Sequence, residues 1–127
     1  MNAEIYQVSK AQFEQSIGNM ENRQVILSAA NLASEIIVGI YAGEALCYIG
    51  LCPRTLLSDD AYIWMLTTKF GLEHPKILVR YSKGTIETIL CKYSKIFGHC
   101  FESASASWLK WLGAEFISKT EFEFRRG

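Results

Sequence analysis

An excess of charge of one sign is missing from this 127-residue sequence, because 13 lysines and arginines balance 13 aspartates and glutamates. No basic stripe stands out, so the electrostatic footprint of a nucleic-acid binder is also missing. We therefore expect no DNA or RNA partner. Half of the residues are hydrophobic and 20% are charged, which is typical of a folded globule. The length predicts a single domain over residues 1–127.

A long apolar run is absent as well. The most apolar region, Ile36 to Cys52, is interrupted by Gly39, Gly43 and Glu44, and so falls short of the roughly 20 apolar residues of a membrane-spanning helix. The first residues, Met1 to Glu4, lack the basic flank and apolar run of a signal peptide. The sequence predicts no membrane partner and a cytoplasmic location.

Closely spaced cysteine pairs are missing too. Cys47 and Cys52 lie five residues apart, and Cys91 and Cys100 lie nine apart. Neither spacing is that of a zinc ribbon or a redox motif. We expect four reduced thiols packed as small apolar side chains, and no metal.

The apolar pattern of the first half predicts a strand, two helices and then three strands. The helices cover about 10–18 and 22–32, and the strands cover 5–9, 36–41, 45–51 and 61–66. Phe13, Ile17 and Met20 mark the buried face of the first helix, and Val25, Ile26, Ala29 and Ala30 mark that of the second. The unbroken apolar run 61–66 predicts a central strand buried on nearly all sides.

The second half predicts a long helix, a strand, a short helix and a terminal hairpin. Pro75 suits the first helical position, and Leu78, Tyr81, Thr85 and Ile89 repeat at helical spacing. A strand at 96–101 and a helix from Ser103 or Ser105 through Leu112 follow, with Gly113 as the C-terminal cap. The hairpin pairs 115–117 with 121–124. The resulting order, β-α-α-β-β-β-α-β-α-β-β, predicts an α/β fold with a mixed sheet.

Two further patterns allow more than one interpretation. Trp108 and Trp111 share a face of the short helix, and a core layer is favoured over a partner-binding patch. Phe122 and Phe124 alternate with glutamates, which predicts a half-exposed terminal strand first and a dimer edge second.

Three stretches carry a resemblance to a known family. They are Ala61-Tyr62-Ile63-Trp64-Met65-Leu66-Thr67-Thr68, the helix start His74-Pro75, and Trp108-Leu109-Lys110-Trp111-Leu112-Gly113-Ala114-Glu115-Phe116. With the order of elements, they make the sequence similar to the Gcn5-related N-acetyltransferases (GNATs), in particular to small GNAT-like proteins of bacteriophages. The resemblance covers roughly Glu35 to Phe116. It implies a three-layer fold with a central mixed sheet flanked by about four helices.

The resemblance also implies an acetyl-CoA site in the cleft where the fourth and fifth strands separate. The pantetheine arm would pair with the backbone of the fourth strand, and the diphosphate would bind amides of the loop Thr68 to His74. The implied cofactor-binding residues are Trp64, Met65, Leu66, Thr67, Thr68, Lys69, Phe70, Gly71 and Leu72. Ordinary turn chemistry explains the paired threonines equally well.

The sequence departs from the family at two positions. Gly71 is the only glycine of that loop, beside the acidic Glu73, and Leu109 stands where the family has its general-acid tyrosine. Another group would have to protonate the leaving thiolate. The candidates are Tyr62, Tyr93 and His99, although a histidine within a phenylalanine-rich strand is more often structural.

Two functions remain open at this point. The first is an acyl-CoA-dependent N-acetyltransferase with a degenerate cofactor loop. The second is a catalytically inactive GNAT-fold binding protein, with a virion or host protein as partner. Either would be a monomer or weak homodimer in the host cytoplasm, or packaged in the virion.

Overall fold

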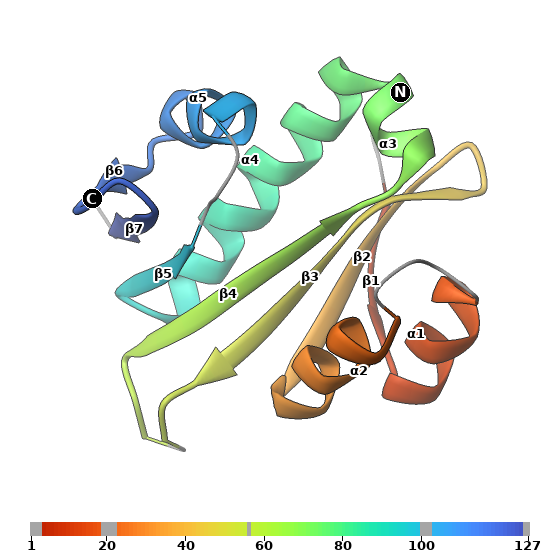
Figure 1. The fold of residues 1–127 in the computed structure, drawn as a ribbon, viewed down its shortest axis with the longest axis horizontal. Helices are drawn as coiled ribbons and strands as arrows, with labels where there is room; N and C mark the ends of the chain where they lie inside the picture. Colours follow the sequence, from red (N-terminus) through yellow and green to blue (C-terminus); the bar gives the residue numbers. More distant parts are fainter. Residues whose placement is uncertain (1–3, 19–22, 56, 100–102, 126–127) are drawn as a thin grey trace.

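A computed structural model of the chain describes residues 4–18, 23–55, 57–99 and 103–125 (Figure 1). The elements in chain order are β1 (Glu4–Val8), α1 (Lys10–Ile17), α2 (Arg23–Leu32), β2 (Glu35–Tyr41), β3 (Glu44–Pro53), β4 (Asp60–Thr67), α3 (Lys69–Glu73), α4 (Pro75–Lys92), β5 (Lys95–His99), α5 (Ser103–Trp111), β6 (Glu115–Phe116) and β7 (Glu121–Arg125). Within the described ranges, no helix is both long and apolar enough to cross a membrane.

The strands form one mixed sheet in the order β1-β2-β3-β4-β5-β7-β6. Only β4 and β5 pair in parallel among the described strands, and every other neighbouring pair is antiparallel. Helices α1 and α2 cover one face of the sheet, and α4 and α5 cover the other (Figure 1). The predicted α/β class, three layers and mixed sheet are therefore confirmed.

Local sequence signals explain where several elements begin and end. Ser9 caps α1 through a capping box with Gln12, because each side chain bonds the other residue's backbone amide. Ala42 and Gly43 both have positive φ, which closes the β2–β3 hairpin with a two-residue turn. Pro75 opens α4, as predicted, at a position where its missing N–H leaves no hydrogen bond unmade.

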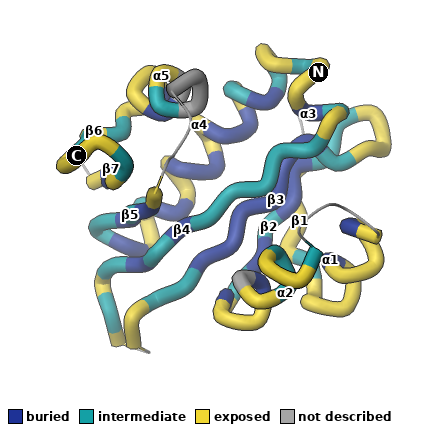
Figure 2. Tube along the Cα trace, viewed as in Figure 1, coloured by how far each residue is buried: buried dark blue, intermediate teal, exposed yellow. Residues whose placement is uncertain are grey.

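The sheet separates two hydrophobic clusters. One contains α4 and α5 side chains packed on β3, β4, β5 and β7, and the other contains Phe13, Ile17 and Ala30 packed on β2 and β3. Leu46 to Leu51 of β3 are buried at every position, and they form the continuous dark blue strand of Figure 2. The central strand of the fold in terms of burial is therefore β3.

The prediction for β4 was right in position and wrong in burial. It lies between β3 and β5 as a central strand, but only Ala61 and Ile63 are buried, whereas Tyr62 and residues 64–67 are half-buried. Ala61, Ile63 and Met65 face α4, whereas Trp64 and Leu66 lie at the margin of the other cluster. Helices α1 and α2 pack mainly on β2 and β3, so they leave the second face of β4 partly uncovered.

Three predictions about single side chains were wrong. Val25 is 69% exposed and Trp111 is 66% exposed, because α2 turns Ile26, Leu27 and Ala30 inward and α5 buries Leu109 instead. Glu123 is buried, because β7 lies between β5 and β6 rather than at the sheet edge. Within this segment, Phe122 and Glu123 pair with β6.

Some predictions concern residues that the structure does not describe. Met20, Cys100 and Phe101 lie outside the described residues, as do the side chains of Ala29 and Trp108.

Candidate functional site

Strands β4 and β5 separate soon after they begin. They pair through Asp60 with Lys95, Ala61 with Ile96 and Tyr62 with Phe97. A Cβ atom on Gly98 would lie 2.8 Å from the carbonyl oxygen of Ile63, so the two strands are still in contact there. Beyond that point, residues 64–67 of β4 pair only with β3 among the described strands. The edge of β4 that faces away from β3 is therefore open to a ligand that can form strand-like hydrogen bonds.

Tyr62 and His99 lie together at the narrow end of this opening. The Tyr62 hydroxyl is 3.4 Å from Nδ1 of His99, and the two ring centroids are 5.8 Å apart. Phe97 packs edge-on against Tyr62 with centroids 5.7 Å apart. Burial, followed by the nearby Cys52, raises the pKa of Tyr62, so its hydroxyl keeps its proton at neutral pH.

Tyr93, the third predicted catalytic candidate, lies elsewhere. It caps the C-terminus of α4, is 6% exposed, and packs in the cluster on the α4 face of the sheet. Tyr62 lies on the opposite face, because β4 residues alternate and its neighbours Ala61 and Ile63 are in the α4 cluster. The structure therefore brings two of the three candidates together.

The predicted cofactor loop is mostly a short helix, α3. Thr68 caps this helix by accepting a hydrogen bond from the Gly71 amide at 3.0 Å. The same hydroxyl donates to the carbonyl oxygens of Ala45 at 2.6 Å and Leu46 at 3.0 Å. Of the two interpretations left open for the threonines, ordinary capping explains Thr68.

Gly71 has an intramolecular role in the structure. A Cβ atom there would lie 2.1 Å from the carbonyl oxygen of Leu46, so only glycine lets α3 pack this close to β3. Its amide donates to Thr68, and the Leu72 amide donates to the Thr68 carbonyl at 3.0 Å. Among the predicted diphosphate ligands, the first-turn amides of Lys69 and Phe70 are the ones that helix geometry leaves without an intrahelical acceptor.

The charges around α3 are mixed. Lys69 and Lys76 are exposed at the starts of α3 and α4, and Glu73 is exposed at the end of α3. His74, between the two helices, packs on Phe70 with ring centroids 4.3 Å apart, and its Nδ1 is 2.9 Å from the Phe70 carbonyl oxygen. The contacts of His74 fit a structural role at this junction.

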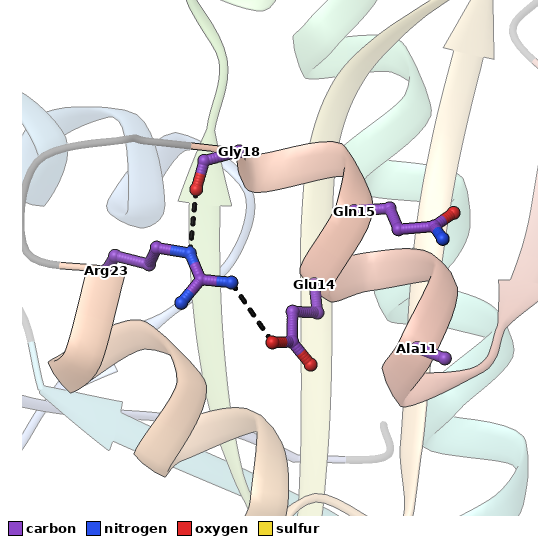
Figure 3. Close-up of a pocket in the computed structure, with 5 residues that line it drawn as sticks. All are labelled: Ala11, Glu14, Gln15, Gly18 and Arg23. Carbon is purple, nitrogen blue, oxygen red and sulfur yellow. Dashed lines mark hydrogen bonds and ion pairs between the residues drawn. The ribbon is translucent and has the colours of Figure 1, made fainter.

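A polar cavity of about 540 Å³ lies away from the β4–β5 opening, between α1 and α2. Figure 3 shows Arg23 reaching across it to the Gly18 carbonyl oxygen at 2.7 Å and to Glu14 at 3.0 Å. These bonds join the two helices and engage Arg23, the Glu14 carboxylate and the Gly18 carbonyl with one another.

Three of the four cysteines lie in the described residues. Cys47, Cys52 and Cys91 are reduced, and burial raises the pKa of Cys47 to about 12. In the part of the chain that the structure describes, no group of three or more His, Cys, Asp or Glu side chains could hold a metal ion.

Sequence reasoning missed two features of the site. Phe97 adjoins Tyr62 only because of the parallel register of β4 and β5, and no local pattern gives that register. Helix α3 had a local signal in Thr68, which precedes Gly71 at the spacing between an N-cap side chain and the backbone amide that donates to it.

Comparison with known proteins identifies the fold. The chain aligns with a provisionally assigned phosphinothricin N-acetyltransferase at a TM-score of 0.72 and 10% identity, covering 99% of both chains. A GNAT-family protein from Desulfovibrio desulfuricans gives 0.68 and 6%, covering 97% of this chain and 98% of that one. Ribosomal-protein-S5-alanine acetyltransferase from Vibrio fischeri gives 0.66 and 12%, covering 98% and 93%.

No protein-family model and no curated protein sequence matches the chain. The similarity is therefore one of structure, and it shows that the chain has the GNAT fold. The sequence resemblance implied a cleft between the fourth and fifth strands. In this chain, β4 and β5 are the strands that separate.

Proposed function

We propose that this protein is an acyl-CoA-dependent N-acetyltransferase that binds acetyl-CoA where β4 and β5 separate. The observation that carries the proposal is the open edge of β4 at residues 64–67, which pairs with β3 on one side and with no described strand on the other. The GNAT-family acetyltransferases that share the fold support the same reaction class.

The described residues fit the pantetheine arm better than the diphosphate. Strand-like hydrogen bonds from Met65 to Thr67 suit an extended amide-containing arm, whatever the side chains are. The diphosphate would rely on the amides of Lys69 and Phe70 and on the ammonium groups of Lys69 and Lys76, because the Gly71 and Leu72 amides are engaged. Weak binding through a degenerate loop follows from this arrangement.

The catalytic candidates are Tyr62 and His99. Bound acetyl-CoA would supply an activated acetyl thioester. Because its pKa is raised, Tyr62 holds a proton that it can donate to a leaving thiolate. His99, 3.4 Å away, can exchange a proton with the Tyr62 oxygen. The family has its general-acid tyrosine at the position of Leu109, which is buried in α5. Tyr62 and His99 would take over the role of that tyrosine.

Tyr62→Phe should lower kcat by about 100-fold, the usual loss when a general acid is removed. The assay is CoA release from acetyl-CoA with a panel of primary amines, and Tyr93→Phe is the matched control, expected to leave kcat within about twofold. Because the pKa of Tyr62 is raised, the parent rate should fall only above the ordinary tyrosine value of about 10. An unchanged rate in Tyr62→Phe would remove Tyr62 from the mechanism.

A second candidate function is a GNAT-fold binding protein without catalysis. This function is favoured by the hydrogen-bonded amides of Gly71 and Leu72 and by the leucine at position 109. It is also favoured by Trp111, whose ring is exposed and lies with its centroid 5.8 Å from Lys83 Nζ. The partner would be a virion or host protein, since the sequence resembles small phage proteins, and the protein would act in the host cytoplasm or the virion. Absence of CoA release with every amine would favour this function.

A further inference from the structure

Strand β4 presents an apolar strip on the face of the sheet that α1 and α2 cover in part. Tyr62, Trp64 and Leu66 alternate with residues that face α4, so the three side chains share this face. All three are half-buried, because α1 and α2 lie mainly over β2 and β3 (Figure 1). A strip of large apolar side chains that stays in contact with water is typical of a surface that binds an apolar group.

The strip begins at the two catalytic candidates. Tyr62 is its first member, and the Tyr62 hydroxyl lies 3.4 Å from Nδ1 of His99. Strand β7 places Glu121 directly opposite His99 in the register of β5 and β7, an arrangement in which the two Cβ atoms are about 5 Å apart. Glu121 is exposed and forms no ion pair with another described residue. One carboxylate is therefore available beside the catalytic pair for one ammonium group.

The end of this face that lies away from the β4–β5 opening carries two cations. Arg54 Cζ lies 4.8 Å and Lys95 Nζ 5.8 Å from the ring centroid of Phe97. The neighbouring carboxylates are already engaged. Asp60 pairs with Arg54 at 3.3 Å, and Glu123 pairs with Lys95 at 3.9 Å. A ligand with a second ammonium group would therefore meet the apolar strip in one direction and the two cations in the other.

We propose that the acetyl acceptor is a primary amine on an aromatic or alkyl body that carries no second positive charge. This inference rests on the proposed acetyltransferase function. The ammonium group of the acceptor lies between Glu121 and His99, and its apolar body extends over Trp64 and Leu66. Contact with the strip removes apolar surface from water and favours such a body. Repulsion by the two cations beside Phe97 disfavours diamines and polyamines.

Acetyl transfer to this amine needs proton movements that the Tyr62–His99 pair can carry. The bound ammonium first loses one proton to water. The neutral nitrogen then forms a bond with the acetyl carbonyl carbon, the C–S bond of the thioester breaks, and the sulfur takes the proton of Tyr62. The second proton that the nitrogen loses returns to the Tyr62 oxygen through His99. The products are the N-acetylated amine and CoA.

Initial rates with hexylamine and 1,6-diaminohexane test the inference, because the second compound adds an ammonium group at the far end of the same chain. At saturating acetyl-CoA, hexylamine should give a kcat/KM about tenfold higher than the diamine. Arg54→Glu should reduce this ratio by about threefold or more, because a carboxylate then replaces a repelling cation. Lys83→Glu is the matched control, since it makes the same charge change on α4, across the sheet, and should leave the ratio unchanged.

The outcomes separate this inference from the proposed function. Equal kcat/KM for the two amines in the parent would overturn the acceptor class and leave the acetyltransferase function standing, even if Arg54→Glu does not fold. An equal reduction of the ratio by Lys83→Glu and Arg54→Glu would also overturn the inference, because the discrimination would then come from the net charge of the protein. Absence of turnover with every amine would contradict the proposed function and this inference with it.

Discussion

Gly71→Ala should lower the free energy of unfolding by about 3 kcal/mol, at the upper end of the usual cost of overpacking. The added methyl group would lie 2.1 Å from the carbonyl oxygen of Leu46. Because that atom belongs to the backbone of the buried strand β3, it cannot rotate away, and α3 must move instead. Urea unfolding monitored by circular dichroism gives the difference.

Gly84→Ala is the matched control for this substitution. Gly84 lies on the exposed side of α4, and a Cβ atom there would meet nothing within 4 Å. Alanine should therefore stabilise the protein by about 0.5–1 kcal/mol through its higher helix propensity. Equal effects of the two substitutions would show that α3 does not pack on β3 as described.

Phe13→Ala should cost about 4 kcal/mol, the middle of the range for a buried phenylalanine. Phe13 is 0% exposed and joins α1 to the sheet through Tyr48, at a centroid distance of 5.1 Å, and Trp64, at 5.7 Å. It lies at the centre of the cluster under α1 and α2. Removing it leaves a cavity that the surrounding sheet cannot close.

Phe97→Ala provides the comparison within the same sheet. Phe97 is half-buried, with Arg54 at 4.8 Å from its ring centroid, and its loss should cost about 1–2 kcal/mol because less apolar area returns to water. Thermal or urea unfolding should rank the two variants in that order. A smaller loss for Phe13→Ala than for Phe97→Ala would contradict the described packing of α1.

Features fixed by neighbouring residues could be predicted from the sequence. The turn at Ala42 and Gly43, the start of α4 at Pro75 and the buried positions Tyr81 and Ile89 all follow from local chemistry. The order of these elements, together with the three stretches that resemble the family, indicated the GNAT fold, which the structural comparisons confirm.

Features that depend on contacts between distant segments could not be predicted. Gly71 was interpreted as a phosphate-binding glycine, yet its surroundings show a contact with Leu46, 25 residues away. The burial of Glu123 depends on β7 inserting beside β5. The meeting of Tyr62 and His99 likewise requires the register of β4 and β5, so the sequence could name these two residues but not place them together.

Calorimetric titration with acetyl-CoA tests the central claim, that the opening beside β4 holds the cofactor. The parent should bind in the micromolar range, and Lys69→Glu combined with Lys76→Glu should weaken binding by about tenfold, since both ammonium groups flank the proposed diphosphate position. Lys119→Glu, in the exposed turn before β7, is the matched control and should bind like the parent. No heat of binding at millimolar acetyl-CoA, or equal affinity in the parent and the double variant, would contradict the proposed site.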